Sequence, residues 1–190
     1  MLVEENLDIS IIISNVIYSD IYLSIIEAYR GAGHNLNCVF VDEHSQLLKN
    51  KICELGIKCY SFKTHNRIQQ IYSMSRLFSF FIKTRPTIIL CLGQVATLLA
   101  FSSAVFSTKA KRIYLRQHTS SNREEYGLLG SIYDRLSNFF ADEILASNSN
   151  QANYLIEEEC VPESKVTVCD FGFSLNKYSN ISSDQIALIR

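Results

Sequence analysis

A cation, an imidazole and several hydroxyls occur together in the segment 116–121, which reads RQHTSS. The segment follows the apolar run 112–115, so its side chains emerge where a strand is expected to end. The His118 imidazole is suited to donate a hydrogen bond or move a proton near neutral pH. The Arg116 guanidinium is suited to hold a phosphate or carboxylate in a two-pronged contact. A polar loop with one histidine also occurs in purely structural roles, so the segment by itself leaves both alternatives open.

These residues must be positioned by a regular framework of strands and helices. Continuous apolar runs predict strands at 9–13, 38–41, 58–62, 87–92, 112–115, 143–146 and 165–168. Helical spacing of apolar residues predicts helices at 22–29, 47–55, 68–82, 95–106, 128–140 and 150–158. Strands without polar alternation, separated by helices, indicate an α/β fold. It is a doubly wound, mainly parallel sheet with helices on both faces.

Ligands of such sheets bind beyond the carboxyl ends of the strands. The loops at that edge are therefore 14–20, 93–94, 117–125 and 148–150. The first of these contains Asn15 but no glycine, and neither a dinucleotide-binding glycine pattern nor a phosphate-binding lysine loop occurs anywhere. This argues against nicotinamide-dependent enzymes and NTPases, and the absence of a Gly-x-Ser-x-Gly elbow argues against hydrolases of that type.

Composition sets further limits. The chain has 190 residues, of which 47% are hydrophobic and 19% charged, which is typical of one folded domain. The net charge of -1 gives no general attraction to nucleic acid, so we expect no nucleic-acid partner. The six cysteines show no zinc-ligand spacing, so we expect no metal site. We also expect the cysteines to be free thiols of the core in a reducing cytoplasm. We expect no cofactor.

Two segments raise the question of a membrane. Residues 88–106 carry no charge, but Gly93 and Gln94 interrupt them, which favours a buried strand, a turn and a buried helix over a spanning helix. The helix expected at 68–82 combines Phe78, Phe80 and Phe81 with nearby Lys and Arg residues. That combination fits a core-facing aromatic side with solvated charges, and it also fits peripheral contact with anionic lipid.

Several segments occur in an order that resembles a known family. They are 112–118 (RIYLRQH), 133–136 (YDRL), 141–147 (ADEILAS), 161–168 (VPESKVTV) and 171–178 (FGFSLNKY). The series resembles the N-terminal domain of group 1, subfamily 4-like retaining glycosyltransferases, which have two facing Rossmann-like domains (the GT-B architecture). The resemblance covers residues 87–178, whereas the earlier part matches only in layout.

The resemblance implies roles for individual residues. His118 matches a catalytic histidine that the family brings to its cleft, and Arg116 matches an arginine two positions before it. Gly93 lies where the family has a loop that lines the cleft. The residues expected to bind substrate are Arg116, Gly93, its neighbour Gln94, Thr119 and Asn15. Two departures stand out: the family's glycine-rich first loop is missing, and the family's donor domain would begin after residue 178. We therefore expect an acceptor-side domain at 1–178 and, at 179–190, the start of a linker to an absent donor-binding domain.

The function that follows is the acceptor-binding half of a glycosyltransferase (hexosyltransferase type). Such an enzyme moves a sugar from a nucleotide-sugar to a glycan or lipid-linked acceptor in cell-surface polysaccharide synthesis. The nucleotide-sugar would bind only with a second domain or partner chain, so we expect this half to be inactive alone. We expect a cytoplasmic location for this function. Peripheral contact with the inner face of the membrane is compatible with it. The alternatives are a subunit of a split glycosyltransferase and a non-catalytic α/β binding module.

Overall fold

Strands and helices alternate along the whole described part of the chain. The computed structural model describes residues 6–16, 20–44, 46–62, 67–116 and 123–169. The strands are β1 Asp8–Val16, β2 Asn35–His44, β3 Lys58–Phe62, β4 Ile88–Leu92, β5 Lys111–Arg116, β6 Glu143–Ala146 and β7 Val166–Val168. The helices are α1 Asp20–Gly31, α2 Gln46–Glu54, α3 Arg67–Thr84, α4 Gln94–Ala104, α5 Arg123–Phe140 and α6 Ser149–Glu157, with a short 3-10 turn η1 at Glu163–Lys165.

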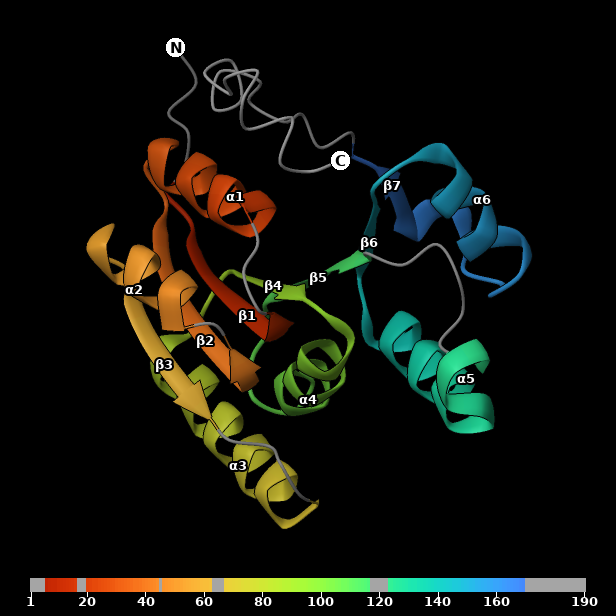
Figure 1. Cartoon of the computed structure of the whole chain (residues 1–190), viewed down its shortest axis with the longest axis horizontal. Helices are drawn as coiled ribbons and strands as arrows, with labels where there is room; N and C mark the ends of the chain where they lie inside the picture. The colour runs from red at the N-terminus through yellow and green to blue at the C-terminus, as the bar shows by residue number, and fades with distance from the viewer. Residues whose placement is uncertain (1–5, 17–19, 45, 63–66, 117–122, 170–190) are drawn as a thin grey trace, which may run out of the picture.

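The strands form one sheet in the order β3-β2-β1-β4-β5-β6-β7, and every pairing is parallel (Figure 1). In this sheet β1 lies between β2 and β4, with Ile13 opposite Phe40 on one side and Leu92 on the other. The doubly wound parallel sheet predicted from the apolar runs is thus confirmed.

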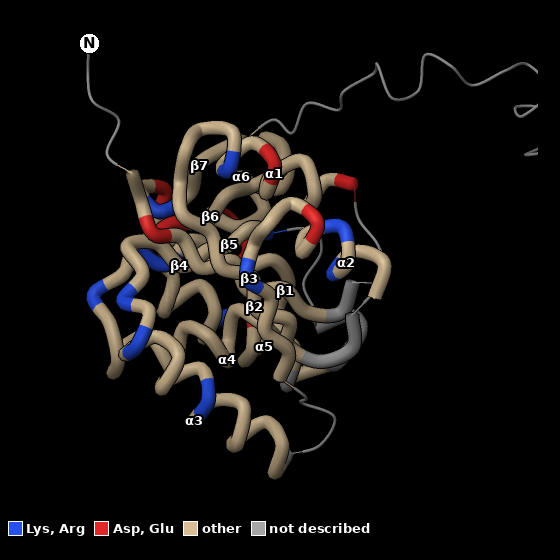
Figure 2. The backbone as a smooth tube through the Cα atoms, turned by 90° about the vertical axis from the view of Figure 1, so that its left-hand side faces the viewer, with Lys and Arg blue, Asp and Glu red and all other residues tan. Residues whose placement is uncertain are grey.

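Helices cover both faces of the sheet, and each face has its own core (Figure 2). Ile12 points into the core shared with α3 and α4, whereas its neighbours Ile11 and Ile13 point into the core shared with α1 and α2. All three side chains are fully buried. Because both faces of β1 are covered, its sequence is a continuous apolar run with no polar alternation.

Element boundaries follow the sequence closely in most places. The bounds of β3 and β6 are those expected, while α5 begins at Arg123, inside the expected loop. Gly127 has non-helical dihedral angles (φ 61°, ψ -143°) and interrupts α5, so that the stretch after it corresponds to the expected helix. The linker expected at 179–190 lies outside the described residues.

The uncharged segment 88–106 folds as β4, a turn at Gly93 and α4, as predicted. Across the described residues, no helix is both long and apolar enough to cross a bilayer.

Candidate functional site

The strand order changes direction between β1 and β4. From β1 the chain builds outward through β2 and β3, then returns to the centre and builds outward on the other side from β4. The helices that follow β1 and β4 pack on opposite faces, α1 in one core and α4 in the other. In doubly wound sheets such a divergence forms a crevice beyond the carboxyl ends of the two strands, and ligands of these folds bind there.

Ser14 and Gly93 meet at this point. The Ser14 hydroxyl accepts a hydrogen bond of 3.0 Å from the backbone N–H of Ala96, in the first turn of α4. Gly93 precedes α4 with φ 105°, and a Cβ atom there would lie 2.7 Å from Ser14 Oγ and 3.0 Å from the Ser14 carbonyl oxygen. Both the dihedral angle and the lack of space require glycine. The end of β1 is thereby held against the start of α4.

A buried carboxylate connects the start of α4 with the end of β5. Gln94 Nε2 donates to Asp134 Oδ1 at 2.8 Å, and Arg116 Nη1 donates to the same oxygen at 3.0 Å. The side chains of Arg116 and Asp134 are 1% and 3% exposed. An ion pair this deeply buried fixes its partners in one arrangement, because separating them would leave an uncompensated charge.

The same guanidinium has a second carboxylate partner. Arg116 Nη2 donates to Glu159 Oε1 at 2.6 Å, and Asn138 Nδ2 donates to Glu159 Oε2 at 2.7 Å. Burial raises the pKa of Glu159, with Arg116 and Asn138 acting in the opposite direction. Burial by itself would lower the pKa of Arg116, but neighbouring groups, Glu159 and Asp134 among them, raise it above its ordinary value. Arg116 therefore stays charged and joins β5, α5 and the end of α6.

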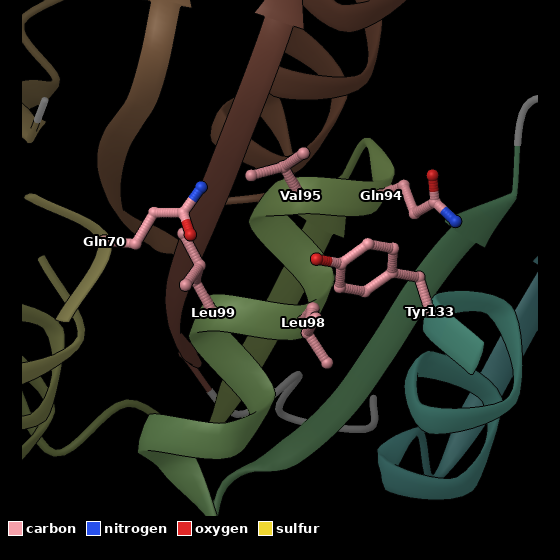
Figure 3. A pocket seen from close by; sticks show the side chains of 6 residues that line it. All are labelled: Gln70, Gln94, Val95, Leu98, Leu99 and Tyr133. Atoms are coloured by element: carbon pink, nitrogen blue, oxygen red, sulfur yellow. The ribbon is translucent and has the colours of Figure 1, made fainter. Parts of the chain in front are cut away.

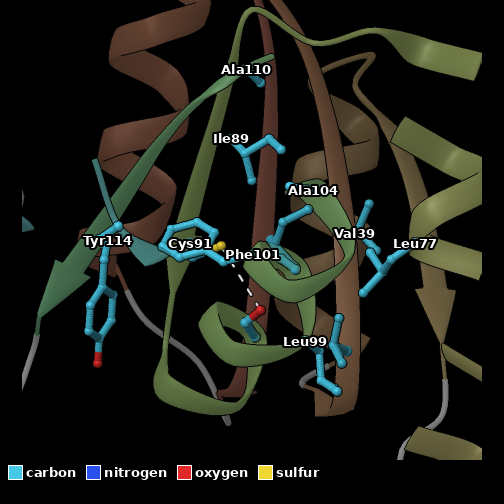
Figure 4. Close-up of a cluster of buried hydrophobic side chains, with 14 of the residues drawn as sticks. Val39, Leu77, Ile89, Cys91, Leu99, Phe101, Ala104, Ala110 and Tyr114 are labelled. Carbon is cyan, nitrogen blue, oxygen red and sulfur yellow. Dashed lines mark hydrogen bonds between the residues drawn. The ribbon is translucent and has the colours of Figure 1, made fainter. Parts of the chain in front are cut away.

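Tyr114 lies on the same face of β5 as Arg116, two residues earlier. Its ring belongs to the core cluster that also contains Phe101 and Cys91 (Figure 4). Burial raises the pKa of Tyr114 to about 12, against a smaller opposing effect of Arg116. The phenol is therefore neutral at physiological pH. The charged groups of the buried network are the Arg116 guanidinium and the carboxylates of Asp134 and Glu159.

A groove of about 120 Å³ opens beside this network (Figure 3). It is lined by Gln70 of α3, by Gln94, Val95, Leu98 and Leu99 of α4, and by Tyr133 of α5. The aliphatic side chains of α4 form its floor, and the polar groups of Gln70, Gln94 and Tyr133 surround them (Figure 3). An apolar floor with a few polar groups is the usual character of a small-molecule site. The bond from Gln94 to Asp134 ties the groove to the buried network.

The structure brings three of the predicted site residues together. Gly93 and Gln94 lie at the crevice, and Arg116 is linked to Gln94 through Asp134. The Arg116 side chain is directed into the buried network, which gives it a positioning role. Its direct contact with substrate stays a prediction. His118 and Thr119 lie outside the described residues, and of Asn15 only the backbone, in β1, is described.

Sequence reasoning did not find Asp134, Glu159 or Ser14. A signal for Asp134 does exist, since it falls at helical spacing with three buried positions, Gly130, Ser137 and Ala141. A carboxylate on the core-facing side of an amphipathic helix needs a buried partner. The loop expected at 148–150 proves to be a helix cap, because Asn148 Oδ1 accepts from Gln151 N–H at 2.9 Å and Gln151 Oε1 accepts from Ser147 N–H at 2.6 Å. No cluster of metal-binding side chains occurs among the residues the structure describes.

Comparison with solved structures identifies the architecture. The chain superposes on Anabaena HepE in complex with UDP and glucose with a TM-score of 0.74 and 14% identity, over 97% of this chain and 50% of HepE. It superposes on the lipopolysaccharide outer core galactosyltransferase WaaB with a TM-score of 0.63 and 12% identity, over 84% of this chain and 44% of WaaB. UDP-GlcNAc 2-epimerase from Methanocaldococcus jannaschii gives a TM-score of 0.65 and 17% identity, over 84% and 44% of the two chains.

The chain has the fold of the N-terminal half of a GT-B protein. It spans about half the length of the solved GT-B structures it matches, 50% in the case of HepE. At identities this low the similarity establishes the GT-B fold alone. No protein-family model matches the sequence, and no curated protein matches it.

Proposed function

We propose that this chain is the acceptor-side domain of a glycosyltransferase that uses a nucleotide-sugar donor. The observation that carries the proposal is the groove lined by α3, α4 and α5, whose residue Gln94 begins the helix that follows β4 at the switch point of a GT-B half-fold. Solved structures with this fold include a galactosyltransferase and proteins complexed with UDP or UDP-glucose. The acceptor is a glycan or a lipid-linked glycan of cell-surface polysaccharide synthesis, which occurs at the cytoplasmic side of the membrane.

The groove gives each neighbouring residue a part in acceptor binding. The apolar floor formed by Val95, Leu98 and Leu99 packs against the nonpolar face of a sugar ring or an alkyl group. Gln94 and Tyr133 offer hydrogen bonds to hydroxyl groups at the margin. His118 acts at the reacting centre and Thr119 and Asn15 contact substrate, in line with the family resemblance. Arg116 acts through Asp134, by fixing the strand end that precedes His118.

The proposal assigns sugar transfer to this chain only in combination with a donor-binding half. Incubation of the purified chain with UDP-glucose and an alkyl glucoside should therefore give no transfer product. Binding of the glucoside, measured by ligand-observed NMR, should be weakened by Leu98→Ser and by His118→Ala. The exposed pair Gln46–Asn50 on α2 supplies the control, because Asn50→Ala removes a hydrogen bond of 2.8 Å far from the groove. Glucoside binding that neither Leu98→Ser nor His118→Ala weakens relative to Asn50→Ala would contradict the acceptor role.

A UDP-sugar epimerase half is the second candidate, since UDP-GlcNAc 2-epimerases share the fold. The two candidates differ in product. With a complementary donor half supplied, an epimerase converts UDP-GlcNAc to its 2-epimer without an acceptor, whereas a transferase releases UDP only when acceptor is present. NMR of the anomeric region distinguishes the two outcomes.

A further inference from the structure

Helix α3 is apolar on its outer side as well as on the side that faces the core. Leu77, Phe80 and Phe81 are buried against the sheet. Ile68, Ile71, Tyr72, Phe78 and Ile82 point outward and are 79%, 69%, 60%, 37% and 46% exposed. The helical period of 3.6 residues places all five on one side of α3, which we call the stripe, with the exposed Ser75 and Ser79 among them. Monomeric proteins seldom leave so many large apolar side chains exposed on one side of a helix, so the stripe indicates an interaction surface.

A further exposed aromatic side chain, Phe106, lies in the turn that follows α4. Helices α3 and α4 pack side by side, with Ser103 Oγ donating to the Met74 carbonyl at 3.2 Å. The starts of β4 and β5 are joined by a bond of 3.0 Å from Lys111 N–H to the Thr87 carbonyl. Phe106, which is 81% exposed, therefore belongs to the same end of the molecule as Ile82.

The charge around the stripe has one sign. No Asp or Glu occurs between Glu54 and Glu124, although the whole chain has a net charge of -1. Figure 2 shows Lys and Arg, and neither Asp nor Glu, along α3. In the same part of the sequence Lys111, Arg112 and Arg116 are bound to carboxylates elsewhere.

Four other cations whose side chains the structure describes lie on α3, directly after it, or just after the turn that follows α4. They are Arg76, Lys83, Arg85 and Lys109. Among the described residues none of the four has a carboxylate within ion-pair distance. The Arg76 guanidinium instead lies over the rings of Phe62 and Tyr72, 5.1 and 5.4 Å from their centroids. No charged residue falls among the apolar side chains of the stripe, in which the only other exposed residues are Ser75 and Ser79.

We propose that the outer face of α3, together with Phe106, Arg85 and Lys109, binds the surface of an anionic lipid bilayer. An amphipathic helix lies in the bilayer interface when its apolar side chains enter the boundary of the acyl chains and flanking cations meet anionic headgroups. A second copy of the chain is a poor occupant, because a symmetric contact would bring Arg76 and Lys83 against their own counterparts without an acidic residue to balance them. Phe80 and Phe81, which the sequence left open as lipid contacts, are in the core.

The orientation of α3 relates this surface to the crevice. The helix follows β3, so it starts at the carboxyl edge of the sheet and runs toward the opposite edge. Gln70, in its first turn, lines the same groove as Gln94. A bilayer lying along α3 would reach the groove at one end. Lipid binding by the outer face of α3 does not depend on the transferase assignment.

Vesicle flotation with the full chain tests the proposal. At low salt the chain should float with vesicles of phosphatidylcholine mixed with phosphatidylglycerol, and far less with pure phosphatidylcholine. Ile71→Ser with Ile82→Ser should reduce the bound fraction on both. Lys83→Gln with Arg85→Gln should weaken binding to the anionic vesicles by about fivefold per charge removed and should lower its salt dependence. Leu47→Ser is the matched control, since Leu47 is 57% exposed on α2, away from the stripe, and this variant should float like the parent chain.

Three results would overturn the proposal. The first is no flotation of the parent chain at low salt. The second is equal flotation of the parent and the Ile71→Ser, Ile82→Ser variant, with circular dichroism showing that both are folded. The third is a concentration-dependent dimer in sedimentation velocity that only the stripe variant abolishes, which would assign the face to self-association. These readouts involve no sugar, so their failure leaves the groove experiments unaffected.

Discussion

Gln94 and Arg116 donate hydrogen bonds to the same carboxylate oxygen, Oδ1 of Asp134, at 2.8 and 3.0 Å. One residue begins the helix after β4 and the other ends β5, so a single buried oxygen sets the distance between two loops of the crevice. Glu159 holds the other side of the guanidinium. The crevice therefore has a rigid support formed by side chains that themselves lie below its surface.

Breaking the pair between Arg116 and Asp134 should be strongly destabilising. Asp134→Leu or Arg116→Met leaves an opposite charge buried without that partner, and we expect each to lower the free energy of unfolding by about 3–5 kcal/mol. The double variant should lose less than the sum of the two, because it removes both charges. Urea unfolding followed by circular dichroism measures the cycle. A strictly additive double variant would show that the pair is not coupled.

The exposed pair of Arg112 and Asp142 is the control for that cycle. Its side chains are 23% and 39% exposed, although their hydrogen bonds are as short as those of the buried pair. Arg112→Met should cost about 1 kcal/mol or less, because solvent screens the pair.

Gly93→Ala should destabilise the fold by about 1–3 kcal/mol, since it combines a strained φ of 105° with a contact of 2.7 Å to Ser14 Oγ. Adding Ser14→Ala should recover part of the loss by removing that oxygen, while the Ser14 carbonyl at 3.0 Å remains. Gly31→Ala is the comparison, because a Cβ atom there meets nothing within 4 Å. Equal stability of the Gly93→Ala and Gly31→Ala variants would contradict the close packing of β1 against α4.

Asp142 should make stability depend on pH in acid. Its hydrogen bonds from the Arg112 side chain hold the pKa of Asp142 below its ordinary value of 3.8. The folded state therefore releases this proton more readily than the unfolded state. The resulting stabilisation is fully present above the unfolded pKa and is lost as the pH falls through the folded pKa. The difference in unfolding free energy between the parent and Asp142→Asn should be larger at about pH 6 than at about pH 2. A difference that stays constant across this range would rule out the linkage.

Lys165 should stabilise the end of α5. Its Nζ donates to the carbonyl oxygens of Ala141, Phe139 and Asn138 at 2.8, 3.3 and 3.5 Å, which are acceptors that a helix terminus leaves without intrahelical partners. Lys165→Met should cost about 1–2 kcal/mol in urea unfolding. Lys58→Met, at an exposed position in β3, should be close to neutral, and equal effects of the two would remove the capping role.

The helices and strands could be predicted from the sequence because burial on two faces leaves a strong local pattern. The run 9–13 has the apolar pattern of a strand buried on both faces, and that pattern is the same whichever strands lie beside it. The order of the strands is a different matter, since no local pattern states that β1 pairs with β4 as well as with β2. The sequence predicted a doubly wound parallel sheet without the order of its strands, and the resemblance to glycosyltransferases supplied only candidate residues at the carboxyl edge.

The support of the site was not predictable in the same way. Asp134 looks like an ordinary helical acid and Glu159 follows a helix, and only the packing of α5 and α6 beside β5 brings both to Arg116. Arg116 was predicted to bind substrate because a guanidinium can hold a phosphate or carboxylate and because it matches an arginine of the glycosyltransferase family. The fold places it among carboxylates contributed by residues far along the chain.

The position of β1 between β2 and β4 also has a consequence for how the chain folds. β2 is made soon after β1, but β4 ends at Leu92, so one edge of an isoleucine-rich strand stays uncovered until three helices have been synthesised. Contacts between distant parts of a chain form slowly, and bare apolar strand edges invite association with other chains. The contact between Ser14 and Gly93 is thus made by a long-range closure, and until then the free edge of β1 is open to pairing with other chains.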